Sequence, residues 1–517
     1  MSTTTIFRTN NPVDFTQVDG VYIDERKPPG AIKGIGNDIV AVVGEFERGP
    51  VDVITPIGSS QQLFQTFGDL GPDASGAFYK GALSLRNKQF SRLRVIRVSN
   101  ASQVLATVTL DDGGGSPVNV LQVDANSTGA WGNSLSVAVV AATDGDATHF
   151  NLQVLRDGVL AELHRNLDPT VIADSASYGI ASDFVALTRL AAGANSGRPV
   201  DVAATSLTTG SDGTFADSDY IGSPSDVRGL ELLRAIGASN IRWVYAAEKT
   251  SLAVNAAILF LTQTTGNKIG IVADPAGTTL ASATVSVLRS DRIIYVYQHV
   301  DTFIPEANGG RGGLVRVAPT SFAAAALAAL PPGRDPAGIN SEPFLTGIRA
   351  IEFPSLSRDD YITMNEQGIM GLQFTAERQR FGFRSGVTAS ITPGLETIER
   401  RTIADFLQES MGAGLVFFQN IQLSEENKLQ VVGAITDFLE KQIRLGLLPS
   451  KEDLDFGDDG KLEPFIVDIT SLNTAQQEAT GLFIVLVRVR IFSSMRFLVL
   501  RTEIGEGVEI KVQDATA

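Results

Sequence analysis

Residues 241–274 read IRWVYAAEKTSLAVNAAILFLTQTTGNKIGIVAD. An apolar run at 241–246 is followed by a helix-forming stretch at 252–264 and a second apolar run at 268–273. Short apolar runs that flank a helical stretch predict a β-α-β unit, in which a crossover helix joins two parallel strands. Strands of a parallel sheet are buried on both faces, which accounts for the continuous apolar character of the two runs.

The same alternation continues on both sides of this stretch. Repeated β-α units predict a largely parallel sheet covered by helices on both faces, so the fold class is α/β. Further strands are expected at 39–43, 93–98 and 293–298, and further helices at 59–67, 74–88, 225–236, 285–289 and 321–330.

Residues 101–215 have a different character. Short β-rich segments are separated by turn-forming Gly, Asp, Asn and Ser residues, which predicts an inserted, surface-facing β-rich domain. Its strands are expected at 104–110, 118–123, 135–141 and 150–156, and a helix at 176–190.

Residues 391–505 predict a last α/β unit. Helices are expected at 395–410 and 424–445, with Ser424 as the N-cap of the second. Glu399, Arg400 and Arg401 are interpreted as an exposed helix face. A long strand is expected at 481–491, and its side chains on one face include Phe483, Val485, Val487 and Val489.

Both chain ends contain a short strand without a local partner. Residues 18–24 are followed by the breaker Lys27-Pro28-Pro29-Gly30, and residues 508–512 follow two glycines. An isolated strand needs a sheet edge to join. The sequence leaves open whether that edge belongs to the same subunit or to another copy.

Composition excludes several classes of function. The chain has 517 residues, which suggests two to four domains, and its net charge of −16 disfavours binding to nucleic acid or anionic membranes. Because there is no cysteine, disulfides, thiolate zinc sites and cysteine nucleophiles are excluded. No signal peptide is evident, and the longest strongly apolar run, 322–330, is too short to span a bilayer.

Motifs of enzymes are also missing. The three histidines form no HExxH, and neither a G-x-S-x-G elbow nor a P-loop occurs. The acidic loop at 453–460 lacks the spacing of a calcium site. We therefore predict no catalytic residue, no metal ligand and no cofactor. The alternative is an α/β hydrolase in which His299 would act with Ser290 and Asp291.

A series of segments, in order along almost the whole chain, resembles the contractile tail sheath proteins of bacteriophages and related injection machines. The most specific is GAWGN at 129–133, which matches the family's G-x-W-G-N motif. Others are GVYIDE at 20–25, VAVVG at 40–44 with RGP at 48–50, LFQTFG at 63–68, LRVIRV at 93–98, residues 207–213 with YIG at 220–222, and DIT at 468–470. Asp19 and Thr209 depart from the family pattern, since proline and glycine are usual there.

The resemblance implies a multidomain chain with extended arms at both ends. Its middle domain would have a subtilisin-like α/β topology without protease activity. The implied division is an N-terminal arm at 1–30, an α/β segment at 31–100 packing with the middle domain, the inserted domain at 101–215, the subtilisin-like domain at 216–390, a C-terminal sheath domain at 391–505 and a C-terminal arm at 506–517.

The resemblance also implies a function. The chain would be a structural subunit, not an enzyme, of a helical sheath of stacked rings, expected to be hexameric, around a tail tube. Contraction would drive the tube through the host envelope for DNA ejection. The partners would be other copies, the tube protein, and the baseplate and tail terminator proteins, without direct nucleic-acid contact or membrane insertion. The location would be the virion, assembled in the bacterial cytoplasm. A phage-derived injection or secretion system is the alternative.

The resemblance finally suggests which residues make the contacts between subunits. The arm strands would contain Val18, Val21, Tyr22 and Ile23 at one end and Val508, Ile510 and Val512 at the other, and strand 481–491 would accept them. Candidates for the tube-facing surface are Arg400, Arg401, Lys441 and Arg444.

Overall fold

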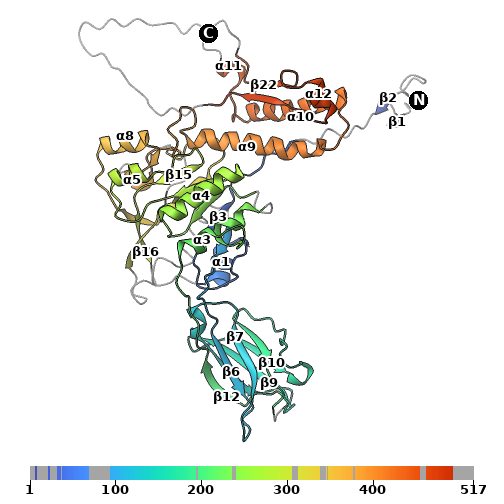
Figure 1. Ribbon diagram of the computed structural model, residues 1–517, viewed down its shortest axis with the longest axis vertical. Helices are drawn as coiled ribbons and strands as arrows, with labels where there is room; N and C mark the ends of the chain where they lie inside the picture. The colour runs from blue at the N-terminus through green and yellow to red at the C-terminus, as the bar shows by residue number, and fades with distance from the viewer. Residues whose placement is uncertain are drawn as a thin grey trace, which may run out of the picture. The chain divides into compact units, whose positions relative to one another are not determined.

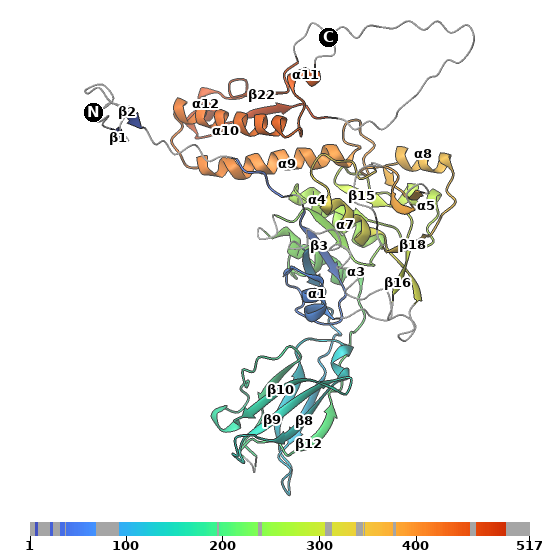
Figure 2. The same cartoon turned by 180° about the vertical axis from the view of Figure 1, so that it is seen from behind.

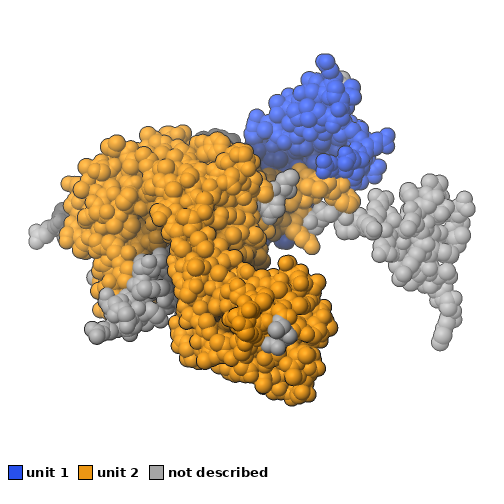
Figure 3. All heavy atoms as spheres, turned by 60° about the horizontal axis from the view of Figure 1, so that its bottom comes forward, with its two compact units in different colours: residues 1–31, 418–517 blue, residues 32–417 orange. Residues whose placement is uncertain are grey.

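The computed structural model of the chain divides into two compact units (Figure 3). One consists of Ile32–Phe417, and the other of Met1–Ala31 with Phe418–Ala517. The residues that the structure describes are 6–8, 21–23, 32–36, 38–68, 93–193, 196–235, 240–304, 313–337, 345, 347–375, 379–454 and 462–492. The expected helix 74–88 lies outside them.

A seven-stranded sheet forms the centre of the larger unit (Figures 1 and 2). All neighbouring strands are parallel except β4, which runs antiparallel to β5 at one edge. The predicted α/β class is therefore confirmed, and segment 31–100 contributes strands to this sheet. In order across the sheet the strands are β19 (Ile369–Met370), β15 (Ile293–Val296), β14 (Ile269–Val272), β13 (Trp243–Ala246), β3 (Val40–Gly44), β5 (Leu93–Arg97) and β4 (Thr55–Ile57).

Helices cover both faces of the sheet. Successive strand residues point to opposite faces, so Val244 packs in one apolar cluster and Trp243 in the other. One face packs against α3 (Asp217–Ile221), η6 (Gly229–Arg234), α4 (Leu252–Thr265), α5 (Leu280–Ser286) and α8 (Arg358–Glu366), and the other against α1 (Ser60–Phe67) and α7 (Thr320–Ala329). Helix α7 is buried along almost its whole length, because its alanines let it lie close to the strands.

Several helix predictions need adjustment. The α-helix expected at 225–236 is wrong for the described residues 225–235, which contain only the 3₁₀ helix η6, whose first residue, Gly229, has a φ of +54°. The helix expected at 285–289 ends at Ser286 and starts earlier, because Thr279 caps it by accepting a hydrogen bond from the Ser282 amide. The predicted start at residue 59 is confirmed, since the Ser59 side chain caps α1.

The insertion predicted at 101–215 folds as two antiparallel sheets around one apolar core. One sheet has the order β10-β9-β8-β12 and the other β11-β7-β6. The expected helix at 176–190 is wrong, because β11 pairs with β7 and alternates buried and exposed side chains. The strands are β6 (Thr107–Asp111), β7 (Asn119–Ala125), β8 (Leu135–Ala141), β9 (Phe150–Arg156), β10 (Val159–Leu167), β11 (Val185–Arg189) and β12 (Val202–Ser206).

The larger unit ends with α9 (Ile398–Leu415), whose predicted boundaries were 395–410. The boundary between the compact units follows Phe417, so α9 lies in the larger unit with the central sheet. The division of the chain into domains, with a C-terminal sheath domain from residue 391, stays a prediction. The remaining strands of this unit are β16 (Val300–Ile304), β17 (Gly313–Val317), β18 (Ile348–Ile351), β20 (Leu372–Thr375) and β21 (Arg380–Phe383).

The smaller unit is built around α10 (Glu425–Arg444). Ser424 caps this helix as predicted, because its hydroxyl accepts a hydrogen bond from the Asn427 amide. The strand expected at 481–491 is shorter than predicted, since only β23 (Leu486–Val489) is paired. The other elements are α11 (Lys451–Leu454), β22 (Phe465–Asp468), α12 (Ala475–Ala479), β1 (Ile6–Arg8) and β2 (Val21–Ile23). Among the described helices, none combines the length and apolar character needed to cross a membrane.

Candidate assembly site

Strands β22 and β23 form a two-stranded antiparallel ribbon in the smaller unit. Phe465 pairs with Val489 and Val467 with Val487, and the Arg490 amide donates to the Pro464 carbonyl at 2.9 Å. No third strand joins this ribbon among the described residues. A two-stranded ribbon alone is marginally stable, and its outer edges offer unpaired backbone groups. The ribbon therefore has the geometry of a sheet that can accept further strands.

Of the four predicted acceptor residues, two lie within β23 and two precede it. Val487 and Val489 lie within the strand, whereas Phe483 and Val485 precede it. Of the predicted arm residues, Val21, Tyr22 and Ile23 form β2, which pairs in parallel with β1 of the same chain. Val18, Val508, Ile510 and Val512 lie outside the described residues. The exchange of these strands between subunits stays a prediction.

The smaller unit also exposes large apolar side chains. Leu429 on α10 is 64% exposed, and Leu445 at the end of α10 is 68% exposed. Exposed apolar side chains gain free energy when another molecule covers them, so these residues are candidates for contacts between subunits. Further exposed apolar residues of this unit are Ile421, Leu462, Ile466, Leu472, Leu482 and Phe492.

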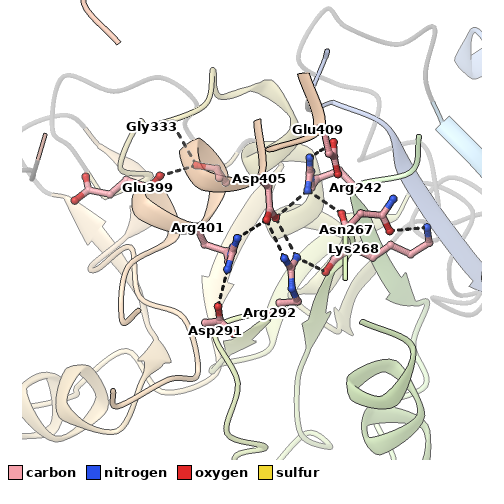
Figure 4. A network of polar contacts seen from close by, with 11 residues as sticks. Arg242, Asn267, Lys268, Asp291, Arg292, Gly333, Glu399, Arg401, Asp405 and Glu409 are labelled. Carbon is pink, nitrogen blue, oxygen red and sulfur yellow. Dashed lines mark hydrogen bonds and ion pairs between the residues drawn. The ribbon is translucent and has the colours of Figure 1, made fainter. Parts of the chain in front are cut away.

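In the larger unit, a network of buried charges connects α9 to the central sheet (Figure 4). The Asp405 carboxylate, 2% exposed, accepts hydrogen bonds from Arg242 Nη1 at 2.8 Å and Arg292 Nη2 at 2.9 Å. Arg401 Nη2 donates to the same carboxylate, and Arg401 Nη1 donates to Asp291 at 2.8 Å. Glu409 accepts a hydrogen bond from Arg242.

Burial shifts the pKa values of this network. Desolvation lowers the pKa of Lys268 to about 8, although Glu409 acts in the opposite direction. Desolvation raises the pKa of Glu409 above its ordinary value, which the neighbouring Arg242 partly offsets. Burial also lowers the pKa of Arg242 despite the attraction of Asp405.

The network changes the interpretation of the predicted tube-facing residues. The exposed helix face expected at 399–401 is wrong, because Glu399 is buried and Arg401 is held by Asp291 and Asp405. Arg400 Nη1 lies 3.7 Å from Oε1 of Glu396, four residues earlier along the chain. Arg444 and Lys441 are exposed on the last turns of α10. A contact between any of these residues and a tube stays a prediction.

The GAWGN segment lies where the inserted domain joins the central sheet. Arg97, at the end of β5, is fully buried, and its guanidinium donates to the carbonyls of Phe46 at 2.9 Å and Gly49 at 3.0 Å. The same group donates to the carbonyl of Thr128, just before the motif, at 2.6 Å. One arginine thus connects the loop after β3 with the inserted domain, and burial lowers the pKa of Arg97 to about 10.

The motif residues have separate roles in this joint. Gly129 has a φ of +132°, and a Cβ there would lie 2.8 Å from Asp212 Oδ1. A Cβ on Gly132 would lie 2.6 Å from the Cβ of Ala106. The Trp131 ring lies below the Arg48 guanidinium at 5.6 Å. Asn133 donates to the Gly210 carbonyl and accepts from the Gly210 amide, both at 2.9 Å.

The residues of the hydrolase alternative are not brought together. Ser290 and Asp291 precede β15, whereas His299 follows it, so they lie at opposite ends of one strand. His299 Nε2 donates to the Asp274 carbonyl at 2.8 Å, and Asp291 accepts from Arg401. Without a convergent nucleophile and base, these three residues cannot form a triad.

The other histidines lie in the inserted domain. His149 Nδ1 lies 2.6 Å from Asp144, with Asp146 and Asp168 near Nε2, and the hydrogen bond to Asp144 raises the pKa of His149. His164 lies 3.1 Å from Glu162. In the described part of the chain, no group of three or more His, Asp or Glu residues is arranged to hold a metal ion.

No protein-family model matches the chain, and no curated protein matches it by sequence. Solved structures match over most of its length. The sheath tail protein of Desulfitobacterium hafniense has a TM-score of 0.61 at 16% identity, covering 87% of this chain and 93% of its own. The sheath tail protein of Listeria innocua has a TM-score of 0.57 at 14% identity, covering 85% and 90%.

A third match is the helical sheath of the anti-feeding prophage in its contracted state. Its TM-score is 0.56 at 12% identity, covering 94% of this chain and 99% of the sheath chain. The chain therefore has the fold of tail sheath proteins, as the sequence resemblance implied, while the subtilisin-like topology of its middle domain stays a prediction.

Proposed function

We propose that this chain is the structural subunit of a contractile sheath, which polymerises helically around a tail tube and shortens to drive the tube through a cell envelope. The observation that carries the proposal is the likeness to sheath proteins over 85–94% of the chain, both compact units included. Fold alone does not fix function, so the proposal also needs surfaces suited to polymerisation.

The β22–β23 ribbon supplies such a surface. A strand that adds to a sheet edge gains main-chain hydrogen bonds in register, while the segment that connects it stays free to bend. In our proposal the arm strands containing residues 21–23 and 508–512 add to ribbons of neighbouring subunits, with Val487 and Val489 on the accepting strand. Head-to-tail contacts of this kind build helical arrays wherever they do not close into a ring.

Exposed apolar residues of the smaller unit support the same assembly. Their burial against other copies contributes to the free energy of association, at roughly 25 cal/mol per Å² of apolar surface. Contacts that form only in the shortened state, summed over many subunits, would supply the energy of contraction without nucleotide hydrolysis. The proposed partners are other copies of the chain, the tube protein and the baseplate and terminator proteins.

Electron microscopy of the purified chain tests the proposal directly. We expect hollow tubes with helical striation in negative stain. If the purified chain remains monomeric at high concentration, and also in the presence of its tube protein, the sheath function is wrong.

The strand-exchange part has its own test. Ile23→Pro removes a backbone donor and the extended hydrogen-bonding pattern from β2, whereas Asp19→Pro, just before the strand, introduces the residue usual in sheath proteins. We expect Ile23→Pro to yield folded subunits that do not form tubes, and Asp19→Pro to polymerise normally. Tubes of normal length from Ile23→Pro would contradict the exchange of the N-terminal strand.

The likeness to the anti-feeding prophage sheath favours a second setting for the same function, a phage-derived injection or secretion system. Neighbouring genes distinguish the settings, since capsid and DNA-packaging genes accompany only a virion. In both settings we propose assembly in the bacterial cytoplasm and a final location in the particle.

A further inference from the structure

Three basic residues stand immediately before three adjacent parallel strands. Arg242 precedes β13, Lys268 precedes β14 and Arg292 precedes β15. Because the strands are parallel neighbours, the three side chains start from the same edge of the sheet, the edge of the strands' amino ends (Figure 4). This edge therefore carries a row of positive charge beneath α9.

Helix α9 carries charges that match the row. Arg401, Asp405 and Glu409 follow one another at intervals of four residues and so lie on one face of the helix. Asp405 bonds to Arg242 and Arg292, and Glu409 bonds to Arg242. A shift of α9 by one turn, about 5.4 Å, would separate Asp405 from both arginines of the sheet.

A second set of contacts joins α9 to the first described residues of this unit. The Ile35 amide donates to the buried Ser410 hydroxyl at 3.1 Å. A Cβ on Gly414 would lie 2.6 Å from Ile32 Cγ1, and a Cβ on Gly34 would lie 3.1 Å from the Phe406 ring. The two glycines thus allow segment 32–36 to lie directly against α9.

Both points at which the chain leaves the larger unit therefore lie next to the C-terminal part of α9. The N-terminal segment enters at residue 32, beside Gly414, and the last segment leaves after residue 417, two residues beyond the end of the helix. We propose that α9 holds in place both points at which the chain leaves the larger unit, and that the Asp405 network fixes α9 to the sheet. We call this network, formed by Asp405 with Arg242, Arg292 and Arg401, the lock.

The lock makes the docking of α9 nearly all-or-none. If α9 tilts away, Asp405 loses Arg242 and Arg292, and Arg401 loses Asp291, while these groups are still partly buried, and buried charges without partners are strongly unfavourable. Intermediate positions of α9 are therefore unfavourable. The mechanical consequence, which rests on the proposed sheath function, is that the N-terminal arm and the segment that leads to the smaller unit both start from points fixed relative to the sheet when a subunit rotates.

Hydrogen exchange measured by mass spectrometry on the full-length free subunit tests the lock. In Asp405→Asn we expect exchange of the α9 amides to rise about 100-fold, and exchange in segment 32–36 to rise with it, while β13 and β15 change little. The matched control is Asp437→Asn, which neutralises an exposed carboxylate on α10 and should change none of these peptides.

Glu409→Gln provides a milder variant if Asp405→Asn does not fold, and it should give the same pattern with a smaller increase. The lock is refuted if α9 exchange stays at the wild-type rate in the folded variant, if β13 and β15 change as much as α9, or if segment 32–36 does not follow α9. This readout needs no polymer, so it is separate from the test of the sheath function. A wild-type chain that forms no tubes would refute that function and leave the lock standing.

Discussion

Replacement of Lys268 by methionine should change how the stability of the larger unit depends on pH. Lys268 is 1% exposed, and burial lowers the pKa of its amino group from 10.5 to about 8. In the unfolded chain the pKa returns to about 10.4. Between these two values the unfolded chain binds one more proton at this position than the folded chain does. The free energy of unfolding therefore rises with pH in this window.

The size of the effect follows from the two pKa values. For a folded value of about 8 and an unfolded value of about 10.4, linkage predicts a gain of about 1.8 kcal/mol between about pH 7.5 and about pH 9.5. Water that reaches the amino group reduces this gain, and we expect about 1 to 1.5 kcal/mol. Methionine does not titrate, so Lys268→Met should lack this part of the pH dependence.

Urea unfolding followed by tryptophan fluorescence measures the effect. One of the two tryptophans is Trp243, the first residue of β13, which is buried beside Arg242. The matched control is Lys33→Met, which removes an exposed lysine of the same unit and should keep the wild-type slope. Equal slopes for wild type and Lys268→Met over this range would refute the burial argument.

Two further predictions concern the inserted domain. Gly132→Val places side-chain atoms against the Cβ of Ala106 and should lower the free energy of unfolding by about 2 kcal/mol or more, which thermal unfolding can measure. The control is Gly115→Val, which should change little because a Cβ there meets nothing within 4 Å. Equal melting temperatures for the two variants would contradict the packing argument. The pKa of His149 should lie above the ordinary value because of its hydrogen bond to Asp144, and Asp144→Asn should lower this pKa. NMR titration of the histidine measures both effects. An unchanged titration midpoint of His149 in Asp144→Asn would mean that this hydrogen bond does not form in solution. The raised pKa means that the favourable interaction is present at low pH and is lost as pH rises through the folded value.

Elements with strong local patterns could be predicted from the sequence. Ser59 and Ser424 each precede an amphipathic stretch, and both cap helices in the structure. The apolar runs before and after α4 are strands, as their continuous apolar character predicted. Residues 176–190 misled the prediction because alanines favour a helix, whereas pairing of β11 with β7 decides the conformation.

The charge network could not be predicted in the same way. Arg242 and Asp405 are separated by 163 residues, and no local pattern relates them. Charged residues on a helix are usually solvated, so Arg401 was assigned to an exposed face. A usable clue was present, since a basic residue lies at or next to the start of each of three consecutive predicted strands, at 242, 268 and 292.

The order of strands in the central sheet has a consequence for synthesis on the ribosome. β3 lies between β5 and β13, and β13 begins about 200 residues after β3 ends. At roughly 5 to 20 residues per second, β3 emerges about 10 to 40 seconds before this neighbour exists. The inserted domain is continuous in sequence and can fold during that interval. The early apolar strands meanwhile have to be shielded, which makes the nascent chain a candidate for chaperone binding until β13 has been made.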